Sequence, residues 1–336
     1  MQESDSRPCL KFSPSARFAL IQSALAPSGA AEMLADPSNV SKLFGSNVAA
    51  VFQSERICSM QQMAVVLRWI VQQAECCAQH LQSHPLKLLP SLRAAESDSS
   101  TAHVALSTSL CCQLLCGMFL DCFDEGSRPR QGKWPFASFS GMLNSFSESC
   151  QSTLCCVLQY FVAVHTSLSS SEEPLVTDTS FIVLQRNAVR SSSNLRRADT
   201  WSKLPVPLCR AIVSRGSLEP KVDDGHVVVD FANKMIGGGV LSGGNVQEEI
   251  MFSKRPEAMV SCLLCETMYK TECIVIYGVR CFSETEGYGG SFAFSRAAPR
   301  PAHSATITIM GHPVAATAGY PRCARVLARL SFNMAH

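Results

Sequence analysis

Two neighbouring features of the sequence point to chemistry: three consecutive glycines, Gly237-Gly238-Gly239, and the triplet Gln247-Glu248-Glu249. Consecutive glycines allow a backbone to approach a ligand closely and to turn its N–H groups toward an anion. Carboxylates beside a bound anion raise each other's pKa, which suits a general acid that must keep its proton near neutral pH. Glycoside cleavage requires such an acid. The combination therefore suits a general acid placed beside a loop that can bind a diphosphate, an arrangement that glycoside cleavage could use.

Each feature also has a simpler interpretation. A run of glycines can be a flexible turn, and two glutamates before a helix can be a solvated first turn that the helix dipole favours. The glycines match neither a P-loop, because no Gly-Lys-Ser/Thr follows, nor the Gly-x-Gly-x-x-Gly pattern of dinucleotide-binding folds. Placement favours the catalytic interpretation, because the glutamates directly follow the glycine-rich stretch and Asp230 precedes it.

The elements that must position these residues follow an α/β pattern. Residues 226–231 form a β-branched run of strand length, residues 256–269 suit a helix with a proline in its first turn, and residues 273–277 form a second apolar strand. We expect a parallel pair of strands joined by a right-handed crossover and covered by helices. Ligands bind at the carboxyl ends of such strands, where sequence order places Asp230 and Asn233.

The first half of the chain is predicted to be helical. Apolar residues recur at helical spacing within 59–82, and further helices are expected within 106–119 and 154–164. Changes in composition divide the chain into a weakly ordered segment (1–50), a helical accessory region (51–175), an incomplete catalytic α/β region (176–296) and a tail (297–336).

The composition excludes several classes of protein. The 336 residues are 46% hydrophobic and 17% charged, which argues against wholesale disorder. The net charge of +2 is not the large excess of positive charge that is typical of nucleic-acid binding. The N-terminus lacks the pattern of a secretory signal, so the 17 cysteines are expected to be reduced thiols. The pair Cys262 and Cys265 lacks further ligands at suitable spacing, so we expect no metal. The apolar stretch 104–123 is too polar for a membrane span.

Several motifs together resemble the poly(ADP-ribose) glycohydrolase family. The central one is the triple glycine followed, after seven residues, by Gln-Glu-Glu, and residues 229–233 resemble the strand and turn before it. Residues 216–219, 285–288 and 294–296 are similar to other family segments, and the helical half shows weaker similarity. The strong similarity covers residues 201–296.

The resemblance implies a macrodomain-like mixed α/β sheet flanked by helices and preceded by an α-helical accessory region. It implies hydrolysis of the ribose–ribose O-glycosidic bonds of poly(ADP-ribose), with release of ADP-ribose and with no cofactor or metal. Glu249 would be the general acid that then activates water, and Glu248 would hydrogen-bond the scissile ribose. The other implied site residues orient the loop or bind substrate, and these are Asp230, Asn233, Gly238, Gly239, Gln247, Leu218, Glu219 and the adenine-stacking Tyr288.

The adjacency of Glu248 and Glu249 also bears on the mechanism. Neighbouring side chains diverge in an extended or turn backbone, so we expect one acid to do chemistry while the other grips hydroxyl groups. An acid and nucleophile pair that flanks one bond is disfavoured by this geometry.

The implied partners are poly(ADP-ribose) and poly(ADP-ribosyl)ated proteins, without direct DNA binding or membrane association. The implied setting is the DNA damage response in the nucleus or the cytoplasm, and we expect a monomer. Similarity ends after Arg296, so we expect residues 297–336 to be an unrelated tail in place of missing strands. A sheet that lacks strands leaves two alternatives open, a catalytically impaired ADP-ribose-binding module and a product that does not fold.

Overall fold

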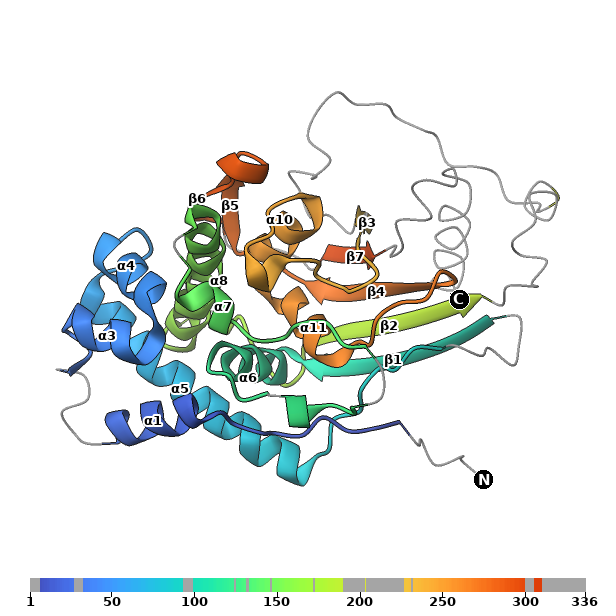
Figure 1. Cartoon of the computed structure of the whole chain (residues 1–336), viewed down its shortest axis with the longest axis horizontal. Helices are drawn as coiled ribbons and strands as arrows, with labels where there is room; N and C mark the ends of the chain where they lie inside the picture. The colour runs from blue at the N-terminus through green and yellow to red at the C-terminus, as the bar shows by residue number, and fades with distance from the viewer. Residues whose placement is uncertain are drawn as a thin grey trace.

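The structure is a computed structural model that describes residues 7–26, 33–92, 99–123, 125–130, 133–145, 147–171, 173–189, 203, 227–230, 232–299 and 305–309. Helices from the first half of the chain gather at one end of the molecule, and the strands of the larger sheet extend from them (Figure 1).

The first helices lie in the segment that we predicted to be weakly ordered. Helix α1 covers Ala16–Leu25, and its N-cap Ser15 accepts a hydrogen bond from the helix backbone. Helix α3 covers Pro37–Phe44 with Asp36 as its N-cap, and α4 covers Ser46–Ser54. The prediction is wrong for these residues. It rested on their content of Ala, Ser and Pro, yet Ser15 is an N-cap and Pro37 is the first residue of α3, positions at which Ser and Pro are favoured.

Three predicted helices are confirmed. Helices α5 (Met60–Ser83), α6 (Thr108–Phe119) and α8 (Glu148–Leu168) bury their apolar residues against one another and against the strands. The short helices η1 (Glu125–Ser127) and α7 (Ser140–Leu143) lie in the connection between α6 and α8. Among the helices described, none combines the length and the hydropathy that crossing a bilayer requires.

The larger sheet has the strand order β1-β2-β4-β7-β3. The pair of β3 with β7 is parallel, and the other three pairs are antiparallel, so the sheet is mixed. In chain order the strands are β1 (Ser99–Ser107), β2 (Phe181–Val189), β3 (Val227–Asp230), β4 (Glu272–Val279) and β7 (Ala305–Ile309).

The pairing of the strands corrects three expectations. Strands β3 and β4 are not a parallel pair, because β7 lies between them and runs antiparallel to β4. Strand β7 belongs to the segment that we expected to be an unrelated tail without strands, and its Ile309 pairs in register with Asp230. Strand β1 comes from the region expected to be helical and pairs with β2. The apolar composition of a strand predicts that it is buried, but it does not predict which strand pairs with it.

The elements after β3 surround the glycines. The loop leads through η3 (Val240–Ser242) to helix α10 (Gln247–Lys254). The helix predicted over 256–269 is shorter than expected, consisting of η4 (Pro256–Met259) and α11 (Val260–Leu264).

A second, two-stranded sheet completes this part of the chain. Strands β5 (Ser283–Glu286) and β6 (Ala293–Ala297) pair antiparallel and are joined through η5 (Gly289–Ser291). Helix α10 lies between this hairpin and strand β3 (Figure 1).

Candidate active site

The carboxylate of Glu248 joins helix α10 to the glycine loop. Its Oε2 accepts a hydrogen bond of 2.9 Å from the N–H of Asn233, and its Oε1 accepts one of 2.7 Å from the N–H of Gly237. Glu248 stands in the first turn of α10, where the free N–H groups of a helix favour negative charge. One side chain therefore holds both the start and the middle of the loop.

Glu249 holds the remainder of the loop. Its Oε1 accepts a hydrogen bond of 2.8 Å from the N–H of Gly239, and its Oε2 accepts one of 3.0 Å from the N–H of Val246. The side chain is buried and faces the glycines instead of bulk solvent. The catalytic interpretation requires this orientation.

Gly238 lies between the two carboxylates. A Cβ atom at this position would come within 3.0 Å of both Glu249 Oε1 and Glu248 Oε2, and its φ of +52° is a left-handed value that favours glycine. Gly244 approaches the carboxyl group of Glu249 in the same manner. We expected the two glutamate side chains to diverge. Instead both reach the same glycine, because the loop wraps across the first turn of α10.

Asp230, at the end of β3, adds a third acid to this site. It is fully buried, and neither carboxylate oxygen has a hydrogen-bond partner in the described part of the chain. Burial raises the pKa of Asp230 well above its usual value, and the charges of Glu248 and Glu249 raise it further.

Burial also raises the pKa of Glu248, to about 7. The charge of Glu249 contributes to this increase, whereas the N–H groups of Asn233 and Gly237 oppose it. The site therefore binds protons at a higher pH than exposed carboxyl groups do, as is common where side chains do acid–base chemistry.

Gln247 and Asn233 lie at the same edge of the sheet. The side-chain Nε2 of Gln247 donates a hydrogen bond of 3.0 Å to the carbonyl oxygen of Val229, which ties the start of α10 to β3. Asn233 is exposed, although its backbone N–H is bonded to Glu248. The structure thus brings together all the predicted residues between Asp230 and Glu249.

Tyr288 lies beside this group on the β5–β6 hairpin. Its side chain is 60% exposed, and the following residue, Gly289, donates a backbone hydrogen bond of 2.9 Å to the carbonyl oxygen of Asn245. The hairpin is thereby attached just before α10. Leu218 and Glu219, predicted to edge an adenine pocket, lie outside the described residues.

Two supports of the loop were missed by sequence reasoning. The thiol of Cys262 donates a hydrogen bond of 3.3 Å to the carbonyl oxygen of Ile236, and the N–H of Met268 donates one of 2.8 Å to the carbonyl oxygen of Lys234. In the described ranges, no group of three His, Cys, Asp or Glu residues could hold a metal ion. Nothing in the local sequence connects these supports to the loop.

Comparison with known proteins agrees with this architecture. Residues 46–182 match the helical domain of poly(ADP-ribose) glycohydrolase, and residues 198–308 match the macro domain fold of the same protein. The second match extends beyond Arg296, where we expected similarity to end, and includes most of β7. The protein is thus of the class in which a helical domain precedes a domain of the macro fold. The chain belongs to the poly(ADP-ribose) glycohydrolase family.

Individual relatives match parts of the chain. It is 34% identical to poly(ADP-ribose) glycohydrolase 1 of Arabidopsis thaliana over 157 residues, which are 47% of this chain and 26% of the relative. It is 51% identical to poly(ADP-ribose) glycohydrolase 1 of Caenorhabditis elegans over 71 residues, which are 21% of this chain and 9% of the relative. It is 47% identical to poly(ADP-ribose) glycohydrolase 2 of the same animal over 77 residues, 23% of this chain and 16% of the relative. The matched part of the chain is therefore well under half of each relative's length.

Proposed function

We propose that this protein hydrolyses the ribose–ribose O-glycosidic bonds of poly(ADP-ribose) and releases ADP-ribose. The observation that carries the proposal is the pair of buried carboxylates, Glu248 and Glu249, that the backbone N–H groups of a glycine loop hold at the end of β3. Membership of the family supports the same activity. The polymer and the proteins that carry it are then the partners of this site.

Glu249 is the general acid in this proposal. It protonates the departing ribose hydroxyl as the glycosidic bond breaks and then accepts a proton from the attacking water. A carboxylate offers about four lone-pair positions, so Glu248 can keep its bonds to Asn233 and Gly237 and still accept hydrogen bonds from the hydroxyls of the scissile ribose. Asp230, buried behind both, orients the loop.

Substrate binding is assigned to the surrounding groups. The backbone of Gly238 and Gly239 approaches the diphosphate closely, because neither residue has a side chain in the way. Tyr288, exposed in the free protein, stacks on adenine, an interaction that contributes about 1–3 kcal/mol per base. Gln247 and Asn233 contact the riboses, and the roles of Leu218 and Glu219 at adenine remain predictions. A monomeric state, a nuclear or cytoplasmic location and a part in the DNA damage response also remain predictions.

The test is the Glu249→Gln variant, assayed for release of ADP-ribose from labelled polymer. Loss of a general acid lowers rates by about 10²–10⁴-fold, so we expect a fall of that size. The amide keeps only one acceptor oxygen for the N–H groups of Gly239 and Val246, so the thermal midpoint should fall modestly while the protein stays folded. The matched control is Glu284→Gln, a partly exposed glutamate on strand β5 that pairs with Arg296, and it should keep full activity. Wild-type protein that binds polymer saturably but releases nothing would instead establish the ADP-ribose-binding alternative.

A further inference from the structure

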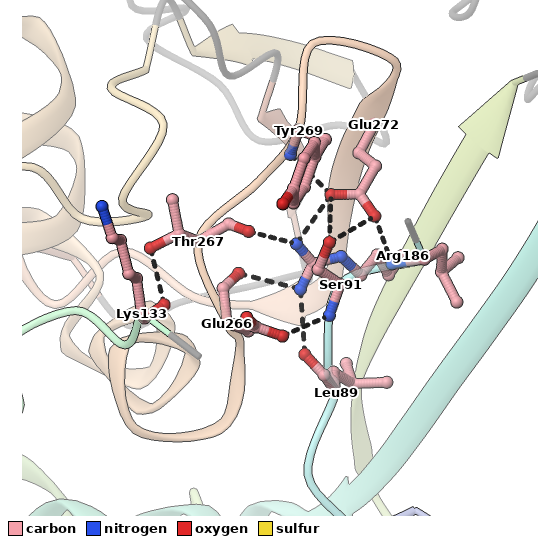
Figure 2. Close-up of polar contacts among 9 residues, drawn as sticks. Leu89, Ser91, Lys133, Arg186, Glu266, Thr267, Tyr269 and Glu272 are labelled. Carbon is pink, nitrogen blue, oxygen red and sulfur yellow. Dashed lines mark hydrogen bonds and ion pairs between the residues drawn. The ribbon is translucent and has the colours of Figure 1, made fainter. Parts of the chain in front are cut away.

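Three segments that are remote in sequence meet beside the catalytic loop. Thr267 donates two hydrogen bonds to the carbonyl oxygen of Lys133, at 2.8 Å from its N–H and 2.6 Å from its Oγ1. Met268 donates one of 2.8 Å from its N–H to the carbonyl oxygen of Lys234. The backbones around residues 133, 234 and 268 therefore lie side by side, and Figure 2 shows Thr267 between Lys133 and Tyr269.

These segments expose positive charge and an aromatic ring. Lys133, Lys234 and Lys270 are exposed, and the side chain of Tyr269 is 45% exposed. Within the described ranges, none of the three ammonium groups forms an ion pair. We call this group of four residues the basic surface.

The acids in the same segment do not neutralise the basic surface. Glu266 and Glu272 are both buried. Glu266 accepts a hydrogen bond from the backbone N–H of Ser91, and Glu272 accepts one from the backbone N–H of Leu92. Glu272 is also paired with the guanidinium of Arg186 at 2.9 Å (Figure 2). The lysines are thus left with a net positive charge that faces solvent.

The backbone under the basic surface is held in place by Arg186. Its guanidinium donates hydrogen bonds of 2.8 Å and 2.9 Å to the carbonyl oxygens of Glu266 and Thr267, and one of 2.9 Å to the carbonyl oxygen of Leu89 (Figure 2). A surface on a fixed backbone loses less entropy when it binds a ligand.

We propose that the basic surface binds the stretch of poly(ADP-ribose) that continues beyond the scissile linkage, as a second subsite for the polymer. This inference rests on the proposed function. Each repeat of the polymer carries a diphosphate and an adenine, so the ammonium groups match its charge and the ring of Tyr269 matches its base.

The position of the basic surface supports this assignment. Lys234 directly follows Asn233, whose backbone N–H is bonded to Glu248, so the backbone that carries Lys234 is attached to the catalytic loop next to a catalytic carboxylate. The β5–β6 hairpin that carries Tyr288 lies on the other side of α10 from β3 (Figure 1). One repeat can therefore lie against Tyr288 while the next repeat leaves the site past Lys234.

The experiment measures equilibrium binding of two probes, ADP-ribose and a poly(ADP-ribose) oligomer of defined length. Both parent and variants carry Glu249→Gln in the full chain to prevent turnover. The variant adds Lys133→Gln and Lys270→Gln, and the matched control adds Lys11→Gln and Lys42→Gln, two exposed lysines of the N-terminal region. We expect oligomer affinity to fall about tenfold in the variant alone, with a salt dependence shallower by about 0.7 per lysine. ADP-ribose affinity should not change.

Tyr269 is tested separately in the same assay. Tyr269→Ala removes the ring and should weaken oligomer binding about 5- to 150-fold, the range expected for one base stack, whereas Tyr269→Phe keeps the ring and should bind like the parent.

The outcomes that overturn the inference are specific. Equal oligomer affinity in parent and lysine variant would overturn it, and so would a parallel loss of ADP-ribose affinity, which would indicate damage to the main site. Single-stranded RNA of equal length that binds as tightly as the oligomer and loses as much affinity in the variant would overturn it in favour of a general polyanion site. Failure of the proposed function appears separately, as absence of ADP-ribose release by the wild-type protein.

Discussion

Buried carboxylates at two places in the described part of the molecule differ in their surroundings. Glu272 faces the fully buried guanidinium of Arg186 at 2.9 Å and accepts further hydrogen bonds from the N–H groups of Leu92 and Tyr269. Glu248 and Asp230 face other acids, and within the described residues neither forms an ion pair. Both groups lie at the larger sheet, yet only one has its charge balanced.

The difference separates a carboxylate that joins segments of the fold from the carboxyl groups that surround Glu249, the general acid of the proposed reaction. A buried ion pair whose terminal guanidinium nitrogens and carboxylate oxygens are hydrogen-bonded holds neighbouring segments together, here residues 89–92 and 266–272. Buried carboxyl groups without a cation bind protons up to neutral pH, and this is the property that acid–base catalysis uses.

The largest expected effect comes from breaking the balanced pair. Arg186→Met leaves the charge of Glu272 buried and unpaired, which should lower the free energy of unfolding by about 3–5 kcal/mol in denaturant titrations. The control is Arg296→Met. Arg296 is exposed and its partner Glu284 is partly exposed on the β5–β6 hairpin, so this variant should unfold like the wild type. Equal effects of the two variants would contradict the comparison.

The unbalanced group should make stability depend on pH. The pKa of Glu248 is about 7 in the folded state against an ordinary value of 4.5, so the folded protein binds a proton that the unfolded chain releases first. This contribution to stability is complete below pH 4.5 and is lost as the pH rises through 7, with a total of about 3 kcal/mol. Unfolding free energies measured between pH 5 and 8 should fall, and Glu248→Gln should flatten the slope. Parallel curves for the two proteins would rule out this role.

The close approach of the loop should control activity. Gly238→Ala places a methyl group within 3.0 Å of both carboxylates, so it must displace them. A misplacement of about 1 Å can lower a rate about 100-fold, and we expect a loss of this order in release of ADP-ribose. Gly290→Ala is the control, because a Cβ at Gly290 has no atom within 4 Å, and it should leave the rate unchanged.

The smallest effect is expected at Asp230. Burial and the charges of Glu248 and Glu249 hold the pKa of this carboxyl group well above its usual value, so an uncharged amide of similar shape is a better replacement here than at an ordinary carboxylate. Asp230→Asn should alter the free energy of unfolding by less than about 1 kcal/mol at pH 7. The variant should become the more stable protein as the pH rises, because only the wild type then acquires a buried charge. A large loss at pH 7 would show that Asp230 is ionised.

Much of the site could be predicted because its residues are close in sequence. The segment from Val229 to Glu249 contains the acids, the glycines and Gln247, and hydrogen bonds within that segment join the glutamates to the glycines and Gln247 to strand β3. Helices α5 and α8 could likewise be predicted, because an apolar face at helical spacing is a local pattern.

Other features could not be predicted, because their cause is not local. The sequence around Cys262 and Met268 contains no sign that their hydrogen bonds support the glycine loop. Strand β7 pairs with β3 and β4, both of which are remote from it in the chain, and the sequence of Ala305–Ile309 contains no motif that predicts this pairing.

By itself the sequence determined the family resemblance, the residues of the catalytic loop and most of the long helices, because these depend on motifs and spacing within short segments. Only the tertiary structure decided which carboxylates are neutralised and which are not. Arg186 and Glu272 are separated along the chain, and they meet only because β2 and β4 pair side by side in the sheet. Charge balance in the interior is set by three-dimensional neighbours, and the degree of burial determines how far an unbalanced charge shifts the pKa of the groups around it.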